Sequence, residues 1–185
     1  MYAERLKVYI DDLAAKLPAP GRGSAAALTA CLGASLVSMV VNFTLGKPGY
    51  AEFEEKNKKS LATAEKLRGE FLSLVDLDVE AYRSKDMRKA LDVPLMISRL
   101  CAEAVKLCPA LIATTNRNLA SDISVAAILL ESAFASAKVN VEINLRTLDD
   151  GKFSRELRRE LDANYKKVRK LRLQTEVRVG KIIRG

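Results

Sequence analysis

The fold is decided by residues 23–46, which read GSAAALTACLGASLVSMVVNFTLG and contain no charged side chain. Small and apolar residues recur there at helical spacing, so the stretch predicts a long buried helix with Ser24 as its N-cap. A stripe of small residues follows one face of this helix: Ala26, Ala30, Ala34, Ser38 and Asn42. Such a stripe lets another backbone approach closely, either within a bundle or across a dimer.

The same stretch is long enough to cross a bilayer. It nevertheless contains polar side chains such as Thr29 and Asn42, and we expect no second segment of this kind in the chain. A signal peptide is also excluded, because Glu4 and Asp11 precede the stretch and no cleavage pattern follows it. We therefore interpret it as the central helix of a soluble, cytoplasmic protein.

Apolar residues at three- and four-residue spacing predict helices along nearly the whole chain. The expected helices cover about 3–17, 24–45, 51–84, 95–113, 121–148 and 152–185, and we expect a kink or short helix at 85–94 because of Pro94. The fold class is therefore all-α: one domain, 1–185, forming an up-and-down antiparallel bundle of five to six long helices that dimerises.

The residue types present restrict the possible chemistry. The chain has no histidine, which removes the commonest proton shuttle and zinc ligand. Cys101 and Cys108 lie about 10 Å apart along one helix, too far for a disulfide. With Cys31 they are expected to be free structural thiols of a reducing compartment. No cysteine cluster has metal-site spacing, so we expect no metal site.

The net charge of +8 comes from the last helix alone, since residues 152–185 contain 12 basic and 4 acidic side chains. An apolar seam from Leu157 to Thr175 indicates that this basic helix packs through one face. A solvated terminal helix explains the charge better than a nucleic-acid site, because aromatic residues are not interleaved with the cations. A basic rim that attracts an anionic substrate tail is a further option.

Polar residues cluster at three helix junctions, namely 18–24, 42–50 and 116–122. Helix breaks and caps explain each cluster taken alone. Asn140 and Asn144 are less ordinary, because they stand one turn apart on an apolar helix and buried amides need partners.

Five blocks, in order, resemble one known family. Residues 18–24, PAPGRGS, resemble the Pro-x-Pro-Gly-Gly-Gly-Ser entry of the formiminotransferase–cyclodeaminase C-terminal domain, with Arg22 in place of the middle glycine. The later blocks are VNFTLGK at 41–47, LVDLD at 74–78, NRNLASD at 116–122 and NVEINL at 140–145. The resemblance covers about 17–148.

The resemblance implies a folate-dependent one-carbon enzyme. It would be a formiminotetrahydrofolate cyclodeaminase, forming 5,10-methenyltetrahydrofolate and ammonia, or alternatively a methenyltetrahydrofolate cyclohydrolase. It would act as a homodimer, without a metal or redox cofactor, a membrane or nucleic acid. The alternatives of another class are a non-catalytic dimeric scaffold and a nucleic-acid-binding bundle.

The matching blocks also imply site residues. Asp122 is the first candidate for the proton-transferring carboxylate, Asp78 is the second, and Lys47 could donate to a leaving group. The candidate substrate-binding residues are Gly21, Gly23, Ser24, Asn42, Asn116, Asn118, Ser121, Asn140 and Asn144.

Overall fold

The structure is a computed structural model that describes residues 2–147 and 151–185. Within these residues the chain is helical and has no strand, which confirms the all-α prediction. The elements are α1 (Tyr2–Ala14), α2 (Arg22–Asn42), the 3-10 helix η1 (Pro48–Phe53), α3 (Glu54–Ser84), α4 (Met87–Ala104), α5 (Leu107–Leu111), the 3-10 helix η2 (Arg117–Leu119), α6 (Ala120–Leu145) and α7 (Gly151–Arg184).

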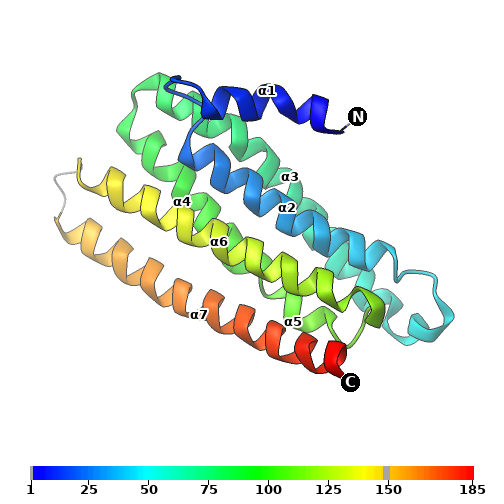
Figure 1. The fold of residues 1–185 in the computed structure, drawn as a ribbon. Helices are drawn as coiled ribbons and strands as arrows, with labels where there is room; N and C mark the ends of the chain where they lie inside the picture. Colours follow the sequence, from blue (N-terminus) through cyan, green and yellow to red (C-terminus); the bar gives the residue numbers. More distant parts are fainter. Residues whose placement is uncertain (1, 148–150) are drawn as a thin grey trace.

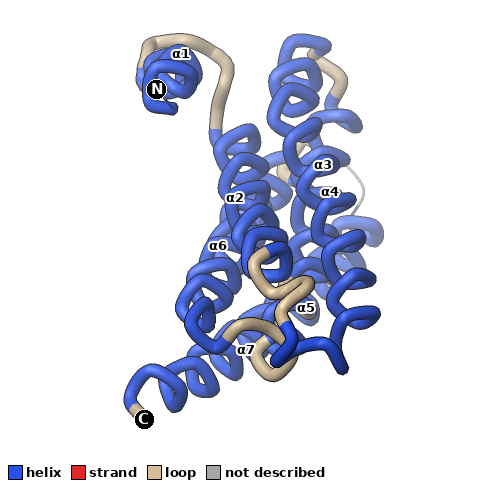
Figure 2. The backbone as a smooth tube through the Cα atoms, turned by 90° about the vertical axis from the view of Figure 1, so that its right-hand side faces the viewer, coloured by secondary structure: helices blue, strands red, loops and turns tan. Residues whose placement is uncertain are grey.

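The long helices form an up-and-down bundle (Figure 1). α2 packs on α3 and α6, and α6 also packs on α4 and α7. Successive long helices are antiparallel, so the start of α2 lies at the same end of the bundle as the ends of α3 and α6. α1 stands apart from the other helices at this end (Figure 2).

The small-residue stripe of α2 serves the bundle itself. Ala26, Ala30, Ala34 and Ser38 are buried, whereas Asn42 is exposed. At Gly33 an added Cβ would come 2.9 Å from Cγ of Leu130 on α6, a contact too short for a side chain. These small residues let α2 approach its neighbours closely, and α2 is the core helix that the sequence predicts.

The region around Pro94 differs from the prediction, because Pro94 lies inside α4. The preceding helix, α3, ends at Ser84, and Lys85 follows it with a left-handed φ of 56°. Asp86 then caps α4, and its side chain accepts the amide of Arg88 at 2.9 Å. A strong N-cap about two turns upstream outweighs the helix-breaking tendency of the proline. The predicted helix 95–113 is in fact the end of α4 and the short α5.

The apolar seam of α7 is confirmed. Leu157, Leu161, Val168 and Thr175 are all buried. Ion pairs from α6 tie down the flanks of α7, including Lys138 to Asp162 at 2.6 Å. The basic helix is therefore an integral part of the bundle.

The cysteines are free and buried, as expected, and burial raises the pKa of Cys108 to about 12.

Two helices are long and apolar. By length and composition, both Arg22–Asn42 and Arg117–Leu145 could span a membrane, so the expectation of a single such segment was wrong. The two segments pack side by side in the bundle, where their apolar faces supply the core.

Candidate active site

The start of α2 is capped from another helix. Ser24 was predicted to be the N-cap, but α2 begins at Arg22 and Gly21 precedes it without a capping side chain. The Ser24 amide instead donates to Oδ2 of Asp78, on α3, at 2.9 Å. The Ser24 hydroxyl lies 3.1 Å from that of Tyr9, which attaches α1 to this point. A carboxylate at a helix N-terminus satisfies a free amide and complements the helix dipole.

The glycine at position 23 is required by Asp78. A Cβ at Gly23 would lie 2.0 Å from Oδ1 of Asp78, which is impossible without moving the carboxyl group. A Cβ at Gly21 would meet nothing within 4 Å. The two glycines of this loop therefore have different roles, and only Gly23 makes room for the acid.

The surroundings of the Asp78 carboxyl group raise its pKa. Its burial raises its pKa above the ordinary value, whereas the Ser24 amide and the charge of Arg22 act to lower it, without cancelling the effect of burial. A carboxyl group with a raised pKa keeps its proton to a higher pH than an exposed one, which favours a role in proton transfer.

Asp78 lies on a small cavity of about 100 Å³. The cavity is lined by Pro18, Ala19, Gly21, Arg22, Gly23, Asp78, Tyr82, Ala90, Pro94, Asn140 and Asn144. Besides Asp78, four residues predicted to bind substrate meet at this cavity. They are Gly21 and Gly23 at the start of α2, and Asn140 and Asn144 on α6. Pro94 and Ala90 carried no sequence signal of a role in the site.

Asn144 repairs a defect in α4. Pro94 has no N–H, so the carbonyl of Ala90, four residues earlier, lacks its helical partner. The side-chain amide of Asn144 donates to this carbonyl. Asn144 is therefore a tie between α6 and α4, a role that the sequence did not reveal.

Asn140, one turn earlier, has no such task. Its side chain is 3% exposed, and in the described part of the chain neither its Nδ2 nor its Oδ1 has a hydrogen-bond partner. An unpaired buried amide is costly, so it indicates a group reserved for a ligand.

The remaining candidates lie at the opposite end of the bundle. Asn42 ends α2, and the 21 residues of that helix place it about 30 Å from Gly23. Lys47, Asn116, Asn118, Ser121 and Asp122 are in the loops and first turn near that far end of α2. We call the cavity region the Asp78 end and the region of 42–57 and 114–122 the Asp122 end.

Loop contacts account for much of the polarity at the Asp122 end. The Asn116 side chain accepts the amide of Asn118 at 3.1 Å, and the Asn116 amide donates to the Thr44 hydroxyl at 3.0 Å. Asn57 donates to the carbonyl of Thr114 at 2.7 Å. Lys47 and Asn118 are exposed, and Asp122 is partly buried in the first turn of α6.

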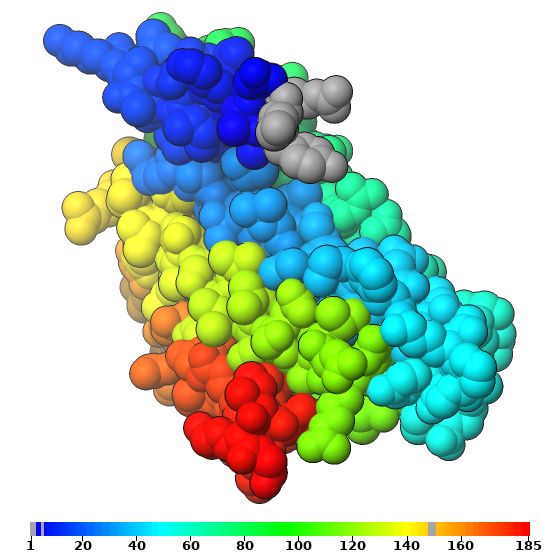
Figure 3. All heavy atoms as spheres, turned by 45° about the vertical axis from the view of Figure 1, so that its right-hand side comes forward, coloured from blue at the N-terminus to red at the C-terminus, as the bar shows by residue number. Residues whose placement is uncertain are grey.

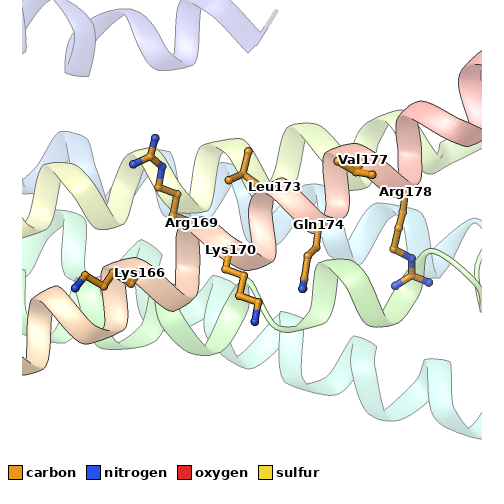
Figure 4. A pocket seen from close by; sticks show the side chains of 7 residues that line it. All are labelled: Lys166, Arg169, Lys170, Leu173, Gln174, Val177 and Arg178. Carbon is orange, nitrogen blue, oxygen red and sulfur yellow. The ribbon is translucent and has the colours of Figure 1, made fainter.

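A larger groove, of about 930 Å³, runs along the outer face of α7. Figure 4 shows its lining residues spread along one helix, with the cationic groups of Lys166, Arg169 and Lys170 directed apart. No acidic residue lines this groove. Its chemistry is that of a solvated basic helix, so the smaller cavity is the better candidate site.

The protein is a helical bundle whose candidate site brings the Asp78 carboxyl and the unpaired Asn140 amide to one cavity. The sequence matches the formiminotransferase-cyclodeaminase family over residues 5–85 and 83–163, and the chain belongs to this family. The match extends into α7, beyond the blocks that carried the resemblance.

Individual relatives agree with the family. The chain is 35% identical over 182 residues to a methenyltetrahydrofolate cyclohydrolase of Methylorubrum extorquens, covering 86% of this chain and 88% of that protein. A formimidoyltransferase-cyclodeaminase of Rattus norvegicus is 26% identical over 85% of this chain, which spans 34% of that longer protein. The crystal structure of a formiminotetrahydrofolate cyclodeaminase from Thermotoga maritima superposes with a TM-score of 0.90 at 27% identity, over 96% of each chain.

Proposed function

We propose that this protein is a folate-dependent one-carbon enzyme, a methenyltetrahydrofolate cyclohydrolase, with Asp78 as its proton-transfer group. The proposal rests on one observation, the half-buried Asp78 carboxyl at the N-terminus of α2 beside an unpaired amide in a cavity. The relative that shares nearly its whole length with this chain carries the same activity in its name.

The reaction needs only proton transfer near a cation. A water oxygen bonds to the bridging carbon of the methenyl cation, and the Asp78 carboxylate takes one water proton. The bond from that carbon to N5 then breaks, N5 receives the proton from Asp78, and the hydroxyl proton leaves to solvent. The product is 10-formyltetrahydrofolate, and one proton is released in each turnover.

Cyclodeamination is the second candidate, supported by the structural likeness to the Thermotoga maritima enzyme. N10 would attack the formimino carbon, and the N10 proton would pass to the formimino nitrogen. The protonated Asp78, favoured by its raised pKa, would then donate a second proton to this nitrogen, and the bond from carbon to nitrogen would break to release ammonia and the methenyl cation. Both reactions share the methenyl compound, so the same carboxyl group serves either.

The proposal reverses the order of the two acids expected from the sequence. Asp122 remains a prediction, but it is about 27 Å along α6 from Asn140, which lines the cavity. Lys47, Asn42, Asn116, Asn118 and Ser121 are at that far end as well. A role for them in the same site needs a second copy of the chain to supply it.

A homodimer forms part of the proposal. The outward faces of α2 and α6 lie side by side on one face of the molecule (Figure 3). They expose large apolar side chains, namely Leu32, Val125, Ile128, Val139 and Ile143. Exposed apolar surface of this kind is typical of an interface. The proposed chemistry uses no metal or redox cofactor, no membrane and no nucleic acid, and it fits the cytoplasm.

The test is a direct assay of both reactions. The purified protein is given 5,10-methenyltetrahydrofolate, and separately 5-formiminotetrahydrofolate, while the near-ultraviolet absorbance of the methenyl compound is followed. A catalysed decrease with the first substrate supports the cyclohydrolase, and a catalysed increase with the second supports the cyclodeaminase. Rates equal to the uncatalysed ones with both substrates would reject the proposed function.

A further inference from the structure

We propose that Asn140 determines substrate specificity by pairing with the cyclic-amide edge of the reduced pterin ring. The proposal rests on the proposed folate function and identifies which part of the substrate enters the cavity. Its basis is the contrast between Asn140 and Asn144, two amides on the same face of α6 that line the same cavity.

The side-chain amide of Asn140 has unused hydrogen-bonding capacity. Its Nδ2 can donate and its Oδ1 can accept, and within the described residues neither atom has a partner. Its side chain is 97% removed from solvent, so water access to the amide is restricted. Leaving a buried polar group unpaired destabilises the fold, which a purely structural role would not explain.

A ligand of Asn140 must match the donor and the acceptor of its primary amide. A primary amide pairs best with a group that offers one acceptor and one donor side by side, which is the pattern of a cyclic amide such as the pterin lactam. The p-aminobenzoyl ring offers no such pair. The glutamyl carboxylates offer only acceptors and would leave Oδ1 of Asn140 unpaired.

The cavity is small, and Asp78 and Asn140 both line it. Its volume of about 100 Å³ admits the edge of a ring but not a whole folate. Asp78 lines the same cavity, so a ring edge held by Asn140 would bring the neighbouring one-carbon unit toward the acid. Asn140 is thus a binding and specificity residue, and Asp78 transfers the proton.

The experiment compares Asn140→Leu with Asn144→Leu in the full-length protein. Leucine keeps the branching of asparagine at Cγ, with methyl groups in place of the amide oxygen and nitrogen, so each change removes the hydrogen-bonding atoms and the Asn144→Leu variant controls for the added bulk. Without ligand, Asn140→Leu is expected to be as stable as the wild type or more so, because an unpaired polar group is removed. Asn144→Leu is expected to unfold at a lower temperature, because the carbonyl of Ala90 loses its donor.

Ligand binding is then measured by calorimetry with the stable 5-formyltetrahydrofolate and with 5-formyltetrahydropteroate, which lacks the glutamate. Two lost hydrogen bonds predict that Asn140→Leu binds both compounds roughly thirtyfold more weakly. An unchanged affinity, a loss only for the compound with glutamate, or a large drop in the ligand-free melting temperature would each overturn the proposal. A wild type that binds neither compound would reject the proposed function itself, and the pterin assignment with it.

Discussion

The two ends of the bundle contain similar polar residues but use them differently. At the Asp122 end, Asn116, Thr44 and Asn57 bond to loop backbone and hold η2 and its neighbours in place. At the Asp78 end, a carboxyl with a raised pKa and an unpaired amide face a common cavity. The Oδ1 of Asn57 at the Asp122 end is also buried without a partner among the described residues, so the Asp78 end is distinguished by an acid and an unpaired amide that line one cavity.

The largest expected difference between the ends concerns their acids. Asp78→Asn should lower the rate of methenyl conversion by roughly a hundredfold or more, the usual effect of losing a general acid–base group. The variant should fold, because Asn can still accept the Ser24 amide. Asp122→Asn should lower stability by about 0.3–1 kcal/mol through the helix dipole and keep most of the rate. The absorbance assay and thermal melts measure both.

The opposite order of rates would contradict the assignment of Asp78 as the proton-transfer group. If Asp122→Asn abolishes the rate while Asp78→Asn keeps it, the sequence-based order of the two acids is correct. Asp78 is then a helix cap.

The two glycines at the start of α2 test whether the position of the Asp78 carboxyl group matters for the rate. Gly23→Ala forces the Asp78 carboxyl away from its position, since the new Cβ would lie 2.0 Å from Oδ1. A displaced catalytic group predicts a rate loss of roughly thirty- to a hundredfold. Gly21→Ala is the matched control, because its Cβ meets nothing within 4 Å, and its rate should equal that of the wild type. Equal rates for the two variants would show that Asp78 does not need its observed place.

The scaffold role of the Asp122 end predicts an effect on stability without one on chemistry. Asn116→Ala removes the side chain that accepts the Asn118 amide, and the loss of such a cap costs about 1 kcal/mol. Urea unfolding should detect this change, and the rate per folded molecule should stay at the wild-type value. A lost rate in a stable variant would place Asn116 in the site instead.

The smallest effect is a pH dependence of stability. Because the folded protein raises the pKa of Asp78 above its ordinary value of 3.8, it retains a proton that the unfolded chain releases. This contribution to stability is present at low pH and is lost as the pH rises from about 4 through the raised pKa. Asp78→Asn lacks that loss, so its stability relative to the wild type should increase with pH. Unfolding midpoints between pH 4 and 8 would contradict this if the difference shrank instead.

Most of the fold could be predicted from the sequence because it depends on local pattern. The apolar α2, the seam of α7 and the buried thiols all follow from composition and periodicity. The helix boundaries near Pro94 could not be predicted, because the Asp86 cap and the Asn144 donor stabilise a helix that Pro94 alone would disfavour.

The candidate site was predicted only in part, because its key contacts join residues far apart in the chain. Gly23 and Asp78 meet only through the packing of α2 on α3. Helix-start rules identify Asp122 and Ser24 as capping positions but do not tell that Asp78 lines a cavity together with Asn140. The family blocks named residues at both ends, and the antiparallel topology separates them.

A bound folate should protect the backbone at the Asp78 end. Amide hydrogen exchange with and without 5-formyltetrahydrofolate would report both ends in one experiment. We expect slowed exchange at residues 21–24, 78–82 and 140–144, with no change at 44–50 and 116–122. Protection confined to 44–50 and 116–122 would contradict this expectation and move the site to the Asp122 end.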